Sequence, residues 1–139
     1  MNSNQKEALA RIGHSKHLDM FLHDEDPWVR GAVAREGNDS HRDKLVNDED
    51  PDVRAHVVQH GNNSHKDKLV NDENPYVRRT VAQYGNASHR DKLVNDKDSN
   101  VRVTVAGYGN KEQATKLVED TNKYVSKAAN RRLKELGAT

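Results

Sequence analysis

A repeat of 24 residues runs through this chain of 139 residues. Residues 47–70 read NDEDPDVRAHVVQHGNNSHKDKLV, residues 71–94 read NDENPYVRRTVAQYGNASHRDKLV, and the two segments are identical at 16 of 24 positions. Self-similarity at such a period is typical of repeat architectures, in which each copy buries its apolar side only against its neighbours. The repeat therefore argues against a fold built around one central core.

The repeat divides residues 1–139 into one domain of about six copies, with no linker between them. A truncated N-terminal capping repeat at 3–22, in which Gly13 corresponds to Gly37, precedes four full repeats at 23–46, 47–70, 71–94 and 95–118. A C-terminal capping helix at 119–139 follows. Leu133 stands there in place of the glycine, so we expect this helix to continue. The side chains expected to face inward are Val125, Ala129, Leu133 and Leu136.

Each full repeat contains signals for a long helix and a short one. Asp26-Pro27 offers an N-cap side chain followed by proline at the first helical position, and Gly37 is expected to end the helix in the left-handed conformation. The run Ser40–Asp43 matches a capping box with Ser40 as the cap of a second segment, which has room for about two turns of α- or 3₁₀-helix. The predicted fold is an all-α, superhelical α-solenoid of about six stacked repeats.

The positions that hardly change between copies indicate the core. Val29, Arg30, Val33 and Ala34 share one side of the long helix, and their equivalents 24, 48 and 72 residues later are nearly the same. Leu45 and its neighbour Val46 add the contribution of the short segment. We expect a thin apolar ribbon that continues from copy to copy.

These residues resemble two related repeat families. The pattern Asp-Pro-x-Val-Arg-x-x-Val-Ala at Asp26–Ala34 is similar to the signature of HEAT repeats, and the period of 24 with a short second helix is closer still to the leucine-rich repeat variant. The resemblance implies a ladder of Asp and Arg side chains between repeats, and Asn74 interrupts its acidic column beside Arg78. The implied pairs are Asp26/Arg30, Asp50/Arg54 and Asp98/Arg102. The iron–sulfur domain associated with some variant-repeat proteins has no counterpart, since there is no cysteine.

Composition narrows the classes of function. Apolar residues make up 32% of the chain, against about 45–50% in ordinary globular domains, and 23 Lys and Arg nearly balance 22 Asp and Glu. The balance argues against a generic nucleic-acid surface, and no apolar run approaches the roughly 20 residues of a membrane span. Without a signal-peptide pattern we expect a cytoplasmic protein. We expect it to be monomeric, because its capping repeats are polar.

The polar residues recur in every copy, whereas catalysis requires one asymmetric group of residues. Histidines form a column that ends at Gln113, and equivalent side chains on helices about 8–10 Å apart are too far from one another to share a zinc ion. We therefore expect each histidine to bond to a neighbouring repeat, and we predict no enzyme activity, metal or cofactor. The column consists of His17, His41, His65 and His89.

The positions that vary within the fixed frame are 28, 31, 32, 35 and 36 and their equivalents. Their spacing places them on the side of the long helix opposite the constant residues. Five of the six aromatic residues are among them, and Trp, Tyr and Arg dominate binding hot spots. Either the tyrosines pad neighbouring helices, or they form a surface that binds another protein, which is the function we predict. The candidate residues are Trp28, Arg35, His60, Tyr76, Arg79, Gln83, Tyr84, Tyr108 and Tyr124.

Nucleic acid is the alternative class of partner. Basic columns along the short segments, together with a basic C-terminal end, resemble the surfaces with which some HEAT-like proteins hold DNA. Acidic residues such as Asp43, Asp67 and Asp91 interleave these columns, which favours an ordinary solvated surface. The candidate nucleic-acid contacts are Arg42, Lys44, Lys66, Lys68, Arg90, Lys92 and Lys116.

Overall fold

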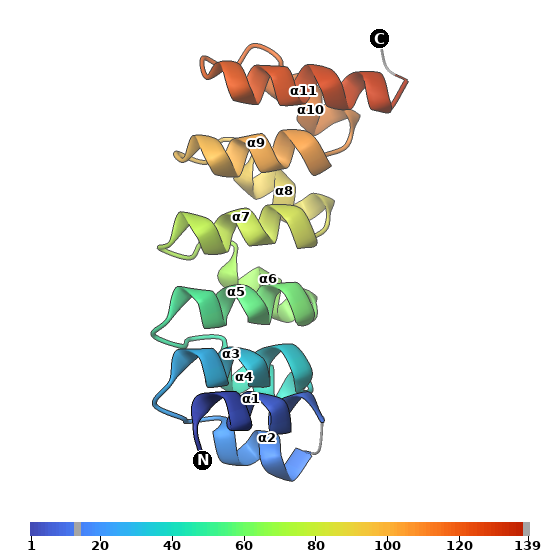
Figure 1. The fold of residues 1–139 in the computed structure, drawn as a ribbon. Coiled ribbons are helices and arrows are strands. Elements are labelled where there is room, and N and C mark those ends of the chain that lie inside the picture. Colours follow the sequence, from blue (N-terminus) through green and yellow to red (C-terminus); the bar gives the residue numbers. More distant parts are fainter. Residues whose placement is uncertain (13–14, 138–139) are drawn as a thin grey trace. The chain divides into compact units, whose positions relative to one another are not determined.

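A computed structural model of the chain describes residues 1–12 and 15–137. These residues form eleven helices and no strand (Figure 1). They fall into two compact units, of which the first ends at Leu69 and the second begins at Val70. The all-α prediction is confirmed. Gly13, expected at the end of the first long helix, lies outside the described residues.

Long and short helices alternate along both units. In the first unit α3 packs between α1 and α5, and in the second unit α9 packs between α7 and α11. The long helices are α1 (Ser3–Arg11), α3 (Pro27–Glu36), α5 (Pro51–His60), α7 (Pro75–Tyr84), α9 (Ser99–Tyr108) and α11 (Lys123–Glu135). The short helices are α2 (Ser15–Phe21), α4 (Asp39–Leu45), α6 (Asn63–Leu69), α8 (Ala87–Leu93) and α10 (Lys111–Leu117). All five short segments are α-helical rather than 3₁₀.

The apolar ribbon that the sequence predicts is buried in both units. Val29, Val33 and Ala34 of α3 are fully buried, and so are Val101, Val105 and Ala106 of α9. Leu45 and Leu93 of the short helices are buried against them. Short valine and alanine side chains let neighbouring long helices approach closely, so each unit forms a core although the chain has few apolar residues.

The short helices α4, α6 and α8 are each capped by an asparagine rather than by the serine that the sequence predicted. Asn38 caps α4: its side chain accepts from the N–H of His41 (3.0 Å), and its own N–H donates to Nδ1 of His41 (3.1 Å). The box thus uses His41 where glutamate is usual, and Ser40 lies within the helix. Because Nδ1 accepts from a backbone N–H, the proton of this imidazole is on Nε2.

The other ring nitrogen bonds to the preceding repeat, as we expected of the histidine column. Nε2 of His41 lies 2.7 Å from Oδ1 of Asp19, and Nε2 of His65 lies 2.6 Å from Oδ1 of Asp43. In the second unit Gln113 makes the same pair of contacts, since its Oε1 accepts from Asn110 N (2.9 Å) and its Nε2 donates to Asp91 (2.8 Å). Each of these residues caps its own helix and holds the repeat before it.

The glycines that follow α3, α5, α7 and α9 are extended rather than left-handed, so the prediction made for Gly37 is wrong. Gly37 has φ −81° and ψ −171°, a conformation open to any residue. Glycine is needed there because of crowding: a Cβ would lie 2.5 Å from Val33 O and 2.8 Å from Nδ1 of His41. The glycine makes room for the capping imidazole.

An arginine–aspartate ladder joins successive repeats, but its acid differs from the predicted one. Arg30 donates from Nε and Nη2 to Asp48 at 2.8 and 3.0 Å, and Arg78 holds Asp96 in the same way at 2.8 and 3.1 Å. The predicted partner Asp26 instead caps α3, accepting from Trp28 N at 2.9 Å. The side chain of Asp26 is already bonded to its own helix, so Arg30 pairs with an aspartate of the next repeat, Asp48.

The corrected ladder removes the interruption expected at Asn74. Asn74 caps α7 by accepting from Tyr76 N, while Arg78 is paired with Asp96. The other predicted acids, Asp50 and Asp98, are likewise N-caps, of α5 and α9. Arg102 pairs with Asp120 instead of Asp98.

The capping repeats modify these contacts. Lys6 occupies the arginine position of the first repeat, and its Nζ lies 2.6 Å from Asp24. In α11, Val125, Ala129 and Leu133 are buried as predicted. The prediction for Leu136 is wrong: it follows the end of the helix and is 43% exposed.

Candidate functional site

The aromatic residues at the variable positions are exposed on the long helices. Trp28 is 65% and Tyr124 63% exposed, and Tyr76, Tyr84 and Tyr108 are between 41% and 49% exposed. A tyrosine that only padded its neighbours would expose little beyond its hydroxyl. These rings therefore present apolar surface to the solvent.

Gly31 and Ala32, which occupy two of the variable positions, do not belong to that surface. Gly31 and Ala32 of α3 are buried, and a Cβ on Gly31 would lie 3.2 Å from Cδ2 of His56 on α5. Small residues on one helix thus face a larger one on the next. Variation at these two positions reflects complementary packing between repeats, which the sequence pattern alone did not distinguish from a binding face.

In the first unit, Trp28 and Arg35 share a carboxylate that sequence analysis missed. Glu7 of α1 accepts from Nε1 of Trp28 at 2.6 Å and lies 2.7 Å from Arg11 and 3.4 Å from Arg35. The hydrogen bond from Trp28 is the largest effect that lowers the pKa of Glu7, and the two arginines add to it. Glu7 stands 24 residues before Gly31, at a variable position, and that was its one sequence signal.

Two histidines lie further along this surface. The rings of His56 and His60 on α5 stack with centroids 6.3 Å apart. Burial lowers the pKa of His56, and the charges of Arg35 and His60 lower it further. Burial and then Arg42 lower the pKa of His60. Both imidazoles are therefore held toward the neutral form.

In the second unit, the candidate residues form rows across α7, α9 and α11, which pack in order (Figure 1). Equivalent positions 24 residues apart lie side by side in such a stack. The first row is Tyr76, Asn100 and Tyr124; the second is Arg79, Val103 and Lys127; the third is Gln83, Gly107 and Arg131; the fourth is Tyr84, Tyr108 and Arg132. Lys123 Nζ lies 5.3 Å from the centroid of the Tyr124 ring.

Part of the basic column proposed for nucleic acid is used within the fold. Arg42 donates from Nη1 to Ala34 O and Gly37 O at 2.9 and 2.8 Å, and Lys66 donates to Gly61 O at 2.8 Å. A cation at the C-terminal end of a helix satisfies unpaired carbonyls and complements the dipole. Lys66 is buried, and this burial lowers its pKa.

The second unit repeats this contact. Arg90 donates to Gly85 O (2.8 Å), and in the last repeat Arg132 reaches back to Gly109 O (2.8 Å). Four of the seven candidate nucleic-acid residues remain exposed on the short helices, namely Lys44, Lys68, Lys92 and Lys116.

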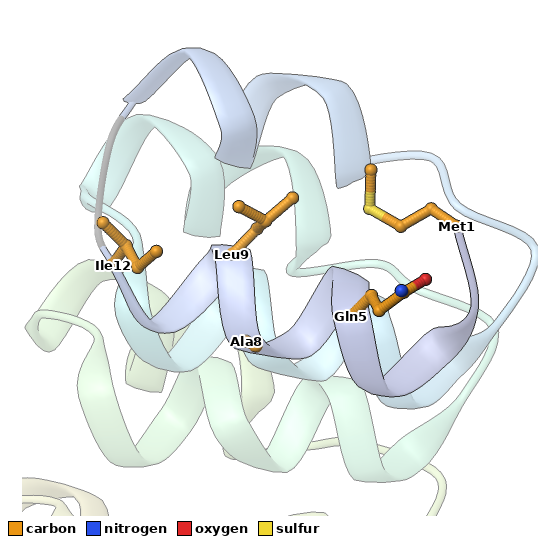
Figure 2. Close-up of a pocket in the computed structure, with 5 residues that line it drawn as sticks. All are labelled: Met1, Gln5, Ala8, Leu9 and Ile12. Carbon is orange, nitrogen blue, oxygen red and sulfur yellow. The ribbon is translucent and has the colours of Figure 1, made fainter.

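A hollow open to solvent lies on α1. It is lined by Met1, Gln5, Ala8, Leu9 and Ile12, and Figure 2 shows these side chains along α1. Its lining contains no ionisable side chain. Over residues 1–12 and 15–137, no group of three or more His, Cys, Asp or Glu residues is placed to hold a metal ion.

The fold and its repeating contacts define an α-helical repeat protein of the solenoid class. Its repeat is similar to that of a solved leucine-rich repeat variant described as having a novel repetitive structural motif. The two match with a TM-score of 0.79 and 26% identity over 96% of this chain, which spans 60% of the other chain. A designed armadillo repeat protein in complex with the peptide (KR)4 is a more distant structural neighbour, with a TM-score of 0.44 and 19% identity over 96% of this chain and 86% of its own.

No protein-family model and no curated protein matches the chain by sequence. Among the described helices, none combines the length and apolar character that crossing a membrane requires.

Proposed function

We propose that this protein is a non-catalytic scaffold that binds another protein through the exposed faces of its long helices. The observation that carries the proposal is that the recurring residues of the repeat are used by the fold, whereas the variable aromatic residues are not. The recurring Val, Arg, His, Asn and Gly residues are used by the core, ladders, caps and close contacts, while the tryptophan and the four tyrosines at the variable positions are exposed.

The composition of the exposed set supports binding. Trp and Tyr lose little conformational freedom relative to the contact area that they provide, and Trp, Tyr and Arg dominate interface hot spots. The proposed contacts in the first unit are Trp28, Arg35 and His60. Those in the second unit are Tyr76, Arg79, Gln83, Tyr84, Tyr108 and Tyr124.

Affinity capture from the native host, with quantitative mass spectrometry, tests this function. The baits are the wild type, Trp28→Ala, Tyr84→Ala and Tyr108→Ala, with Lys68→Ala and Lys92→Ala on the short helices as matched exposed controls. We expect the aromatic variants to lose a protein that the wild type and the lysine variants retain, with unchanged helicity and melting temperature. Equal capture by all six baits would refute the proposed surface. Loss only with the lysine variants, with nucleic acid in the eluate, would favour the short-helix columns.

A further inference from the structure

The long helices of the second unit are almost devoid of acidic residues. α7 and α9 contain no Asp or Glu, and α11 contains only Glu135, its last residue. Two of the arginines on these helices, Arg78 and Arg102, are paired with the loop carboxylates Asp96 and Asp120. Five further cations are exposed and, within the part of the chain that the structure describes, have no carboxylate in ion-pair contact. They are Arg79, Lys123, Lys127, Arg131 and Lys134.

The first unit shows that the repeat can neutralise such charge. There Glu7 pairs with both Arg11 and Arg35, and Glu36 lies 3.3 Å from Arg35. In the second unit no acid stands at the equivalent variable positions. The pKa of Arg90 is lowered by burial and then by the nearby charge of Arg132, which is consistent with a local excess of positive charge.

The cations lie among tyrosines around an open centre. Gly107 is exposed in the middle of the third row, between Gln83 of α7 and Arg131 of α11. No neighbouring heavy atom would lie within 4 Å of a Cβ added there. Tyr108 is the next residue of α9, and Tyr84 occupies the equivalent place on α7. The surface combines uncompensated cations, exposed aromatic rings and room for an incoming chain.

Resting on the proposed function, we infer that the partner presents an acidic, extended segment, which lies across α7, α9 and α11 with its carboxylates on Arg79, Lys127 and Arg131. Charge complementarity selects such a segment and suppresses basic ones. Arg79 and Lys127 lie on helices two apart, or about 16–20 Å at ordinary helix spacing. An extended chain covers that distance in about five or six residues. The tyrosine rings would contact its apolar side chains and backbone.

Gly107 allows a test that leaves the fold intact, because a side chain added there meets open space. Gly107→Glu and Gly107→Lys place side chains of similar size and opposite charge at the centre of the surface. The probe is a fluorescent peptide that alternates glutamate with leucine, and its binding is followed by anisotropy at low salt. We expect Gly107→Glu to weaken binding about threefold to tenfold and Gly107→Lys to strengthen it by a similar factor. Added salt should weaken binding to all three proteins.

Each other outcome overturns the inference. Equal weakening by both substitutions would mean that bulk rather than charge matters, and no change would place the peptide elsewhere. A peptide alternating lysine with leucine that binds as tightly would remove the charge selection. Tighter, Gly107-dependent binding of labelled single-stranded DNA would identify a nucleic acid as the occupant. If affinity capture finds a Tyr108-dependent protein partner while the acidic peptide fails to bind, this inference falls and the proposed function stands.

Discussion

His65 offers a direct measure of what holds one repeat to the next. Its imidazole is fully buried, accepts from Asn62 N at 3.0 Å and lies 2.6 Å from Asp43. His65→Ala removes both bonds, each with a net value of about 1 kcal/mol, and leaves a cavity in a buried site. We expect the free energy of unfolding to fall by about 3 kcal/mol.

His65→Gln is the matched control, because the protein already uses glutamine at the equivalent position. Gln113 is buried, accepts from Asn110 N and donates to Asp91, which are the same two contacts. We therefore expect His65→Gln to cost less than about 1 kcal/mol. Urea unfolding followed by circular dichroism measures both variants. If glutamine destabilises as much as alanine, or if alanine costs almost nothing, the two-sided hydrogen bonding is not what holds the repeat.

Three further predictions test the fold. Gly85→Ala should lower the free energy of unfolding by at least about 2 kcal/mol, because the added Cβ would lie 2.5 Å from Val81 O. Gly107→Ala places its Cβ in open space and should raise the free energy of unfolding by up to about 1 kcal/mol. Equal effects of the two substitutions in urea unfolding would refute the crowding argument. Asp96→Asn should cost about 3 kcal/mol, because it leaves the buried Arg78 without its anion, and an unchanged urea midpoint would count against the ladder. Burial lowers the pKa of His56, so the imidazole binds a proton more readily in the unfolded chain than in the folded one. The free energy of unfolding should therefore decrease as the pH falls below about 6.5, the ordinary pKa of histidine. His56→Gln should reduce this decrease when unfolding is measured at about pH 8 and pH 5.

The period and the apolar pattern predicted the fold because each copy repeats the same helix signals. The helices α3, α5 and α7 begin at the predicted Asp-Pro and Asn-Pro steps, and Val29 and Val33 are buried as expected. Local signals failed where two recurring residues of the same type could each fill one role. Asp26 and Asp48 both recur at fixed positions, and only three-dimensional contacts show that the first caps a helix while the second holds Arg30.

The candidate surface was predicted in part. The exposure of Trp28 and the tyrosines agrees with their one-sided variation, whereas Gly31 and Ala32 vary because they pack against the next helix. Glu7 was missed because it lies in the truncated first copy, where the register is hard to compare. The sequence shows a basic C-terminal end, but which cations are paired with a carboxylate could be learned only from the ion pairs themselves.

The central claim is that recurring residues hold the stack and variable aromatic residues bind the partner. The most direct test measures unfolding and partner capture together for the double variant Tyr84→Ser/Tyr108→Ser. We predict a free energy of unfolding within about 0.5 kcal/mol of the wild type and loss of the captured protein. A loss of more than about 2 kcal/mol with the partner still retained would contradict the claim, because the tyrosines would then serve the fold.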